Sequence, residues 1–383
     1  MTEAKRTFGR WWTAGILLAA IAGILAVVSH DFLSMHVDLP IYPGDGVTEI
    51  RRLSDYFDGI AGSAADTDVY ILEGSEPGGT ALVLGGTHPN EPAASVTAIV
   101  LVENAHVEKG RLIVIPHANH SAFTCTEPQE GYPQTYTIET PTGPREFRYG
   151  SRGTNPIDQW PDPVIYINAA GQALAGAEVR NLNRSYPGSA TGNLTEQLAY
   201  AIVELIQQED VDISVDLHEA SPEYPVINAI VAHEDALGIA AEAALFLEFE
   251  GVQIGVERSP ENLRGLSHRE WGDATDTLAL LAESPNAAQG RLRGRTDEAL
   301  IVEGIDPYYV RAAERGLVYV PFSEEGHPLS ERVGRHLQTV SMLLQVYNDY
   351  TDAAIVVHDV PTLATLLEDG LGTYLAPPED EAS

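Results

Sequence analysis

The amino-acid sequence predicts an α/β fold in which a mixed, mostly parallel sheet has helices on both of its faces. Two features predict this fold. Apolar runs of strand length recur between residues 69 and 283, and several of them are separated by segments with the apolar periodicity of helices. Strands that alternate with helices are typical of such covered sheets, which bind their ligands at the carboxyl ends of the strands.

The predicted elements follow one another along a main domain at residues 69–350. The expected strands are residues 69–74, 80–86, 111–116, 212–217, 228–233 and 277–283, and the expected helices are residues 92–104, 195–208, 235–249 and 330–350. In the second of these helices, Leu198 and Ile202 fall on one apolar face. Asn193 or Thr195 can cap its start.

Three further segments lie outside this pattern. Residues 31–68 are rich in Asp, Gly and Pro, so we interpret them as a linker and lead-in segment with a short helix around residues 47–57. Residues 121–180 are dense in Pro, Gly, Tyr and Thr and are interpreted as an insertion over one edge of the ligand site, with a hairpin folded around its PTGP sequence. Residues 351–383 form a C-terminal segment whose acidic end, from Glu368 onward, we expect to be disordered.

Residues 1–30 predict a membrane anchor. Basic residues within the first ten precede an uncharged, apolar stretch at residues 11–28. This stretch is longer than the roughly 7 to 15 residues of a signal-peptide core and is long enough to span a bilayer. The basic flank predicts a cytoplasmic N-terminus and a body outside the membrane. The alternative is a signal peptide cleaved near Ser29, which would give a secreted or periplasmic protein, so the body is exported in both cases.

The composition argues against some classes of protein. The net charge of −34, from 56 acidic and 22 basic residues, would repel nucleic acid and anionic membrane surfaces, so we expect no nucleic-acid partner. The single cysteine, Cys125, cannot form an intramolecular disulfide. The exported body therefore depends on its core or on a bound metal. The oligomeric state stays open.

His88 and Glu91 lie in the sequence GGTHPNEPAAS, directly after the predicted strand 80–86. A nitrogen and oxygen pair of this kind suits Zn²⁺, and a catalytic zinc site needs a third protein ligand while a fourth position stays open. His218, in ISVDLHEAS, is the best candidate because it also ends a predicted strand. We therefore expect one Zn²⁺ per chain, held by these three residues. The alternative is a solvated polar turn, and Pro92 excludes a helix-borne HExxH site.

Several motifs, in order, resemble one known family. The sequences GGTHPNEPAA, IPHANHSAF, NLNRSYPG, VDLHE and LAESP resemble the succinylglutamate desuccinylase and aspartoacylase family, whose members are relatives of the zinc carboxypeptidases. The resemblance covers roughly residues 69–345. It implies a zinc carboxypeptidase-like fold, and it implies that His88, Glu91 and His218 are the zinc ligands.

A hydrolase of this kind needs a carboxylate that takes a proton from water and passes it to the leaving nitrogen. Glu283 ends the apolar run TLALLAE, where burial can raise the pKa of a carboxyl group. The resembled family places its general acid and base at a strand-end glutamate in this region, so Glu283 is our choice. Glu219 and Glu257 are the alternatives, and Glu283 itself could simply end a strand.

The resemblance also implies residues that bind the substrate. Asn183 and Arg184, in NLNRSYPG, match the family's asparagine and arginine pair that binds a substrate carboxylate, a task that suits the planar arginine fork. A second arginine usually polarises the carbonyl group that is attacked. Arg180 and Arg152 both compete for this role. The alternative is that these arginines pair with surface acids.

These residues predict a zinc-dependent hydrolase of an amide bond, acting on an N-acyl amino acid or a related small molecule or short peptide with a carboxylate. A zinc carboxypeptidase or a cell-wall peptide amidase is the closest alternative, and the sequence does not decide between them. An alternative of another class is a non-catalytic binding protein tethered to the membrane. The complete set of His88, Glu91, His218 and Glu283 argues against a mere binding protein.

Overall fold

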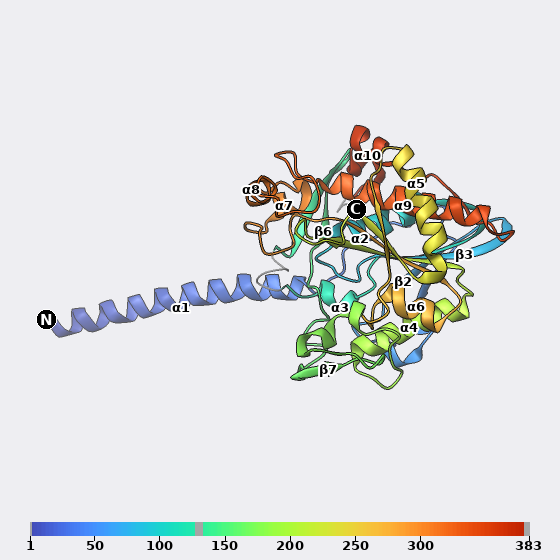
Figure 1. Ribbon diagram of the computed structural model, residues 1–383. Coiled ribbons are helices and arrows are strands. Elements are labelled where there is room, and N and C mark those ends of the chain that lie inside the picture. Colours follow the sequence, from blue (N-terminus) through green and yellow to red (C-terminus); the bar gives the residue numbers. More distant parts are fainter. Residues whose placement is uncertain (1, 127–132, 379–383) are drawn as a thin grey trace. The chain divides into compact units, whose positions relative to one another are not determined.

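The computed structural model of the chain describes residues 2–126 and 133–378. The chain divides into two compact units, Met1–Pro40 and Ile41–Ser383. The first unit contains the long helix α1 (Thr2–Ser34) (Figure 1). Its segment Trp11–Ser34 is long and apolar enough to cross a membrane. A helix of this kind near the N-terminus fits a membrane anchor and a signal sequence alike, so the anchor stays a prediction.

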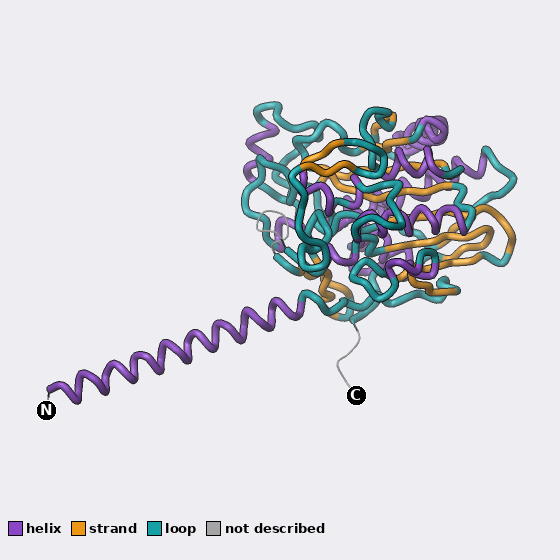
Figure 2. Tube along the Cα trace, turned by 90° about the horizontal axis from the view of Figure 1, so that it is seen from below, coloured by secondary structure: helices purple, strands orange, loops and turns teal. Residues whose placement is uncertain are grey.

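The second unit is built around one mixed sheet (Figures 1 and 2). Its strands lie in the order β1-β2-β4-β3-β9-β12-β10-β11, with β13 paired to β4. The four central strands β4, β3, β9 and β12 are mutually parallel, whereas β2 and β10 run antiparallel to their central neighbours. The strands are β1 (Glu49–Arg52), β2 (Asp68–Glu73), β3 (Glu76–Leu84), β4 (His106–Ile115), β9 (Ile213–Ala220), β10 (Ala229–Ala232), β11 (Gly255–Arg258), β12 (Leu278–Pro285) and β13 (Val356–His358).

Helices pack on both faces of this sheet, and each face has its own apolar core. Helices α2, α5 and α9 share one core with Val83 of β3, whereas α4 and Trp271 of α6 share the other with Leu82 and Leu84. Successive residues of a strand point to opposite faces, which explains this division. The helices are α2 (Pro92–Asn104), α3 (His120–Phe123), α4 (Leu194–Gln208), α5 (Leu237–Phe249), α6 (Ser267–Ala274), α7 (Glu298–Glu303), α8 (Pro307–Ala313), α9 (Leu329–Asp349) and α10 (Leu363–Asp369).

This architecture confirms the predicted α/β class, and each of the expected strands and helices of the main domain has a counterpart in it. The cap of α4 is Asn193, whose side chain accepts a hydrogen bond from the Glu196 amide, while the Glu196 side chain bonds back to the Asn193 amide. This reciprocal capping box satisfies two amide groups that a helix start otherwise leaves without partners. The sequence had left the choice between Asn193 and Thr195 open.

The segment expected to be a linker contains ordered structure. The short helix expected around residues 47–57 is present only as the single 3₁₀ turn η1 (Leu53–Asp55), because residues 49–52 form β1, which pairs antiparallel with β2. A second 3₁₀ turn, η2 (Asp58–Ile60), follows. The edge of the sheet offers backbone partners to residues 49–52. As a strand at this edge, residues 49–52 form backbone hydrogen bonds with β2. This pairing outweighs the local helix propensity of the segment.

The expected hairpin is present as β5 (Thr135–Thr140) paired with β6 (Gly143–Arg148). A second pair, β7 (Ile165–Ile167) with β8 (Ala173–Ala175), and the turns η3 (Gly176–Arg180) and η4 (Leu182–Arg184) complete the described part of this region. Residues 127–132, which the predicted insertion includes, lie outside the described residues.

The C-terminal segment differs from its expected disorder in the part that the structure describes. Helix α10 continues to Asp369 and is followed by η6 (Leu371–Tyr374). The Asn104 side chain donates a hydrogen bond to the Tyr374 carbonyl, and the Ala376 amide donates to Glu103. These contacts with the end of α2 hold the backbone in place, which an acidic composition does not reveal. Residues 379–383 lie outside the described residues.

Candidate metal and active site

Three parallel strands bring the predicted site residues to one edge of the sheet. His88 follows the end of β3, His218 lies near the end of β9, and Glu283 on β12 is the direct cross-strand partner of His218. Glu91 occupies the position just before α2, whose first residue is Pro92. The expectation that the site lies at the carboxyl ends of the strands therefore agrees with the structure.

A glycine turn carries His88 from β3 into the site. Gly86 has a φ of 71°, a left-handed conformation that a residue with a side chain adopts only at a cost. A Cβ atom at this position would lie 2.6 Å from the Pro116 carbonyl oxygen. The carbonyl groups of Gly85 and Gly86 accept hydrogen bonds from the amides of Ala118 and Asn119. The turn is therefore fixed on both sides, and so is the start of the loop that carries His88.

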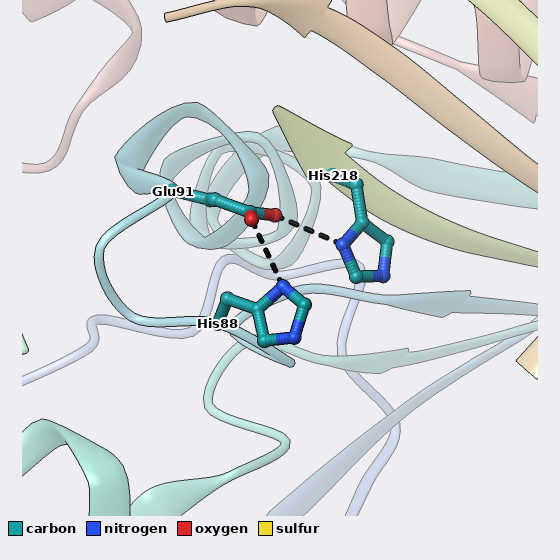
Figure 3. A group of neighbouring side chains, drawn as sticks. All are labelled: His88, Glu91 and His218. Carbon is teal, nitrogen blue, oxygen red and sulfur yellow. Dashed lines mark hydrogen bonds and ion pairs between the residues drawn. The ribbon is translucent and has the colours of Figure 1, made fainter. Parts of the chain in front are cut away.

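The two histidines point at the carboxylate of Glu91 from two directions (Figure 3). His88 Nδ1 lies 2.9 Å from Glu91 Oε1, and His218 Nδ1 lies 2.9 Å from Glu91 Oε2. All three side chains are buried, and one ligand atom from each lies within 4.8 Å of the others. This spacing brings two nitrogen donors and one oxygen donor around a single point.

The outer nitrogens of both imidazoles face hydrogen-bond acceptors. His88 Nε2 lies 2.9 Å from Asn181 Oδ1, and His218 Nε2 lies 2.8 Å from Asp216 Oδ2. These acceptors favour a hydrogen on each Nε2, so each Nδ1, which contacts Glu91 here, is the nitrogen that could give up its hydrogen and bind a metal. Two such nitrogens with one carboxylate form the donor set of a catalytic zinc ion, so the residues present fit Zn²⁺.

The two imidazoles differ in their pKa. Burial lowers the pKa of His88 to about 4, and the positive charge of Arg152 acts in the same direction. Burial also acts to lower the pKa of His218, but the carboxylates of Asp216 and Glu91 outweigh it and hold that pKa well above its usual value. The surroundings of His218 thus favour positive charge at this point in the site.

Glu283 has the environment of a carboxyl group prepared for proton transfer. Its Oε2 atom is buried and has no hydrogen-bond partner among the described residues. Burial raises the pKa of Glu283 to about 8, and the nearby carboxylates of Glu91 and Asp216 act in the same direction. The other two candidate acids differ. Glu219 forms a fully buried ion pair with Arg332 at 2.6 Å, and Glu257 is exposed on β11.

A cavity of about 310 Å³ lies at this edge of the sheet. The side chains that line it are His88, Glu91, Arg152, Asn183, Arg184, His218, Glu219, Ala220, Ser221, Tyr224, Val226, Val231, Pro260, Leu263, Leu266, His268, Leu281, Glu283 and Gln289. Every site residue that the sequence proposed is in this set except Arg180 and the alternative acid Glu257. The Arg180 side chain pairs with Asp162 at 2.8 Å and donates to the Thr154 carbonyl.

Two arginines face the cavity. Arg152, from the predicted insertion, donates from Nη1 to Glu91 Oε1 at 3.0 Å. Arg184 donates from Nη1 to the carbonyl of its neighbour Asn183 at 2.6 Å. Burial lowers the pKa of Arg184, and the charge of Arg152 adds to this effect. Two cationic groups that oppose each other in a buried cavity form a site that favours an anionic ligand.

The sequence prediction missed residues that orient the predicted ligands. Asp216 lies two residues before His218 on the same face of β9. The alternation of side chains along a strand could have predicted from VDLHE that these two residues are neighbours. Asn181 begins the motif NLNRSYPG but was not assigned a role. His268 lies on α6, in a polar segment where no element was expected, so no signal pointed to it.

The fold and the site together form a candidate metal centre at the carboxyl ends of the strands of an α/β sheet. No protein-family model matches the sequence, and no curated protein is significantly similar to it. Solved structures are similar to the chain, however, at low sequence identity.

One of these structures is a succinylglutamate desuccinylase/aspartoacylase from Rhodobacter sphaeroides, with 17% identity, a TM-score of 0.37, and coverage of 59% of this chain and 54% of that chain. A second is a metallo-carboxypeptidase from Burkholderia cenocepacia, with 13% identity, a TM-score of 0.44, and coverage of 84% and 68%. A third is the product-bound cell shape determinant protein Csd4 from Helicobacter pylori, with 12% identity, a TM-score of 0.46, and coverage of 79% and 60%. The chain thus spans only about half of the desuccinylase's length.

Proposed function

We propose that the protein is a zinc-dependent hydrolase that cleaves an amide bond in a substrate carrying a carboxylate. One observation carries this proposal. The Nδ1 atoms of His88 and His218 converge on the carboxylate of Glu91, in the same cavity as a buried oxygen of Glu283 that has no partner among the described residues. A structural role for these groups would leave Glu283 without a reason to be buried.

In the proposed reaction His88, Glu91 and His218 hold one Zn²⁺, which supplies Lewis-acid chemistry when bound. Glu283 takes a proton from the attacking water and delivers it to the leaving nitrogen, a role that its raised pKa supports. Arg152 donates a hydrogen bond to the carbonyl oxygen as negative charge develops there. The contact of Arg152 with Glu91 supports Arg152 rather than Arg180 in this role, because the Arg180 guanidinium is held by Asp162.

Arg184 and Asn183 bind the carboxylate of the substrate in this proposal. An arginine fork can hold a carboxylate through two parallel hydrogen bonds, and Arg184 forms no ion pair with another described residue, since its side chain donates to the Asn183 carbonyl. The substrate is an N-acyl amino acid or a short peptide, and carboxypeptidase or peptide amidase activity would use the same groups.

We also propose that α1 tethers the catalytic unit to the outer side of a membrane, since basic residues precede its apolar segment.

Metal content and hydrolysis, measured on the same preparations of the full chain in detergent, test this proposal. We expect about one zinc per chain by mass spectrometry, lost when His88→Ala and His218→Ala are combined. Glu283→Gln should keep the zinc but lose hydrolysis of N-acetyl amino acids by at least about a hundredfold, as expected for a general base. Glu257→Gln, the same change at an exposed acid outside the cavity, is the matched control. The proposal would be refuted if the chain bound no zinc after zinc is supplied, or if the Glu283→Gln variant hydrolysed the substrate at the rate of the parent chain.

A further inference from the structure

The part of the cavity beside the metal cluster is lined by apolar side chains. Leu281 lies two residues before Glu283 on β12, so both point to the same face of the sheet. Val231 of β10 is the direct cross-strand partner of Leu281. Leu263 and Leu266 line the cavity from the loop before α6. We call these four residues, together with His268 of α6, the His268 subsite.

This subsite adjoins the proposed carboxylate-binding arginine. The Asn168 side chain donates hydrogen bonds to the carbonyls of both Arg184 and Arg264, and Tyr186 donates from its amide to the carbonyl of Gly265. These bonds join the Arg184 turn to the loop that carries Leu263 and Leu266. A residue whose carboxylate rests on Arg184 would therefore have the His268 subsite within reach of its side chain.

His268 places one polar group in these apolar surroundings. Its contacts determine whether the ring nitrogen that faces the cavity donates or accepts a hydrogen bond. The imidazole is only 4% exposed, and Nδ1 lies 2.8 Å from Ser259 Oγ. That oxygen already accepts a hydrogen bond from Arg269 Nε at 3.1 Å. Its remaining partner among the described residues is His268, so the Ser259 hydroxyl donates its hydrogen to His268 Nδ1.

A histidine that accepts at Nδ1 and is neutral carries its hydrogen on Nε2. Burial lowers the pKa of His268 to about 3, with the positive charges of His218, Arg269, Arg184 and His233 acting in the same direction. His268 is therefore neutral at physiological pH. Its Nε2 has no partner among the described residues, and the side chain lines the cavity. The subsite thus presents one neutral N–H donor and no compensating charge of its own.

We propose that the His268 subsite selects an uncharged, largely apolar side chain with one hydrogen-bond acceptor, which His268 Nε2 binds, as in glutamine. The proposal rests on the proposed function, since Arg184 and Glu283 act on the carboxylate and the amine nitrogen of that same residue. A glutamate side chain has the same shape as glutamine, but its charge would lose hydration in the apolar subsite. The nearby arginines already have partners, because Arg269 pairs with Glu234 and Asp273 and Arg184 binds the main carboxylate of the substrate. A leucine side chain fits but leaves the Nε2 hydrogen without a partner.

The first test compares three substrates on the zinc-loaded full chain in detergent. N-acetyl-L-glutamine, N-acetyl-L-glutamate and N-acetyl-L-leucine are assayed for kcat/KM, and the dissociation constants of the free amino acids are measured by calorimetry, which needs no hydrolysis. We expect glutamine to exceed glutamate at least about tenfold in both measurements. If kcat/KM and the affinity for glutamate were equal to or higher than those for glutamine, the proposed subsite would be overturned. Binding selectivity without any hydrolysis would uphold the subsite and refute the hydrolase.

The second test removes the donor. His268→Leu should weaken L-glutamine binding about tenfold while leaving L-leucine binding within about twofold, because only glutamine uses the hydrogen bond. His268→Gln, which keeps a donor, should restore part of the glutamine preference. His358→Leu, the same change at a histidine whose side chain is 53% exposed, is the control and should match the parent chain. An equal loss of glutamine and leucine binding in His268→Leu would show a merely structural role and overturn the proposal.

Discussion

Glu219 and Glu283 line one cavity in opposite environments. Glu219 accepts hydrogen bonds from Arg332, from the Ala93 amide and from Asn286, whereas Glu283 Oε2 has no partner among the described residues. Both are acids at the ends of strands, so sequence reasoning had to keep both as candidates. What separates them is an arginine 113 positions away from Glu219 in the chain. Such long-range contacts are not visible in a local pattern.

The buried ion pair of Glu219 gives a prediction for stability. Both side chains are 0% exposed, so Arg332→Met would leave the Glu219 charge buried and uncompensated. We expect a loss of about 3 to 5 kcal/mol in the free energy of unfolding, measured by urea denaturation. Arg335→Met, on the same helix, removes a partly exposed pair with Glu331 and should cost less than about 1 kcal/mol. Similar losses in the two variants would contradict the assignment of Arg332 as a buried counter-ion.

The neutral state of His268 predicts a dependence of stability on pH. In the unfolded chain its pKa is about 6.5, whereas burial lowers the folded pKa to about 3. Below pH 6.5 the unfolded chain therefore binds a proton that the folded chain does not, and stability falls as the pH falls toward 3. This group should contribute a loss of about 2 kcal/mol between pH 7 and pH 5. His268→Gln should remove this part of the dependence of the unfolding free energy on pH, measured by urea denaturation at each pH. An unchanged dependence would contradict the lowered pKa of His268.

Among the elements, length and apolar content decided which could be predicted. The long elements, such as α2 and β12, bury continuous apolar runs and were visible in the sequence. Helix α6 was not, because its sequence SHREWGDA looks like a solvated loop although Ser267–Trp271 is buried. Its polar groups are satisfied inside the protein, as when Ser267 donates to Asp216 and Arg269 to Glu234. Polarity indicates exposure only where such partners are lacking.

The turn between β3 and α2 gives a prediction at the scale of elements. Gly86→Ala places a Cβ 2.6 Å from the Pro116 carbonyl oxygen at a φ of 71°, so both strain and a backbone clash oppose it. We expect a loss of about 2 to 4 kcal/mol in the free energy of unfolding, together with weaker zinc retention because the His88 loop must move. Gly62→Ala has a φ of 68° but nothing within 4 Å of the added atom, so it isolates the conformational cost of about 1 kcal/mol. Equal effects of both substitutions would show that the close approach at Gly86 is tolerated.

At the scale of the whole molecule, the order of the strands is what sequence could not provide. The motifs from GGTHPNEPAA to LAESP predicted that site residues end strands, but the sheet order β4-β3-β9-β12 follows from pairings such as Leu84 with Asp216. These pairings bring residues far apart in the chain into register. The resemblance to a known family predicted a fold and a site together, and it did so because it depended on ordered motifs rather than on local periodicity.

The charge of the whole chain leads to a final prediction. Acidic residues outnumber basic ones by 56 to 22, and buried pairs such as Arg145 with Glu103 remove one charge of each sign from the surface, so the excess of negative charge remains there. The folded chain therefore repels itself, and salt screens this repulsion over a distance that falls from about 30 Å at 0.01 M to about 3 Å at 1 M ionic strength. We expect the melting temperature of the full chain to rise by several degrees between these concentrations of NaCl. Sucrose at matched osmolarity, which does not screen charge, should produce a smaller rise. A melting temperature that stays constant or falls as NaCl increases would mean that surface repulsion does not limit the stability of the fold.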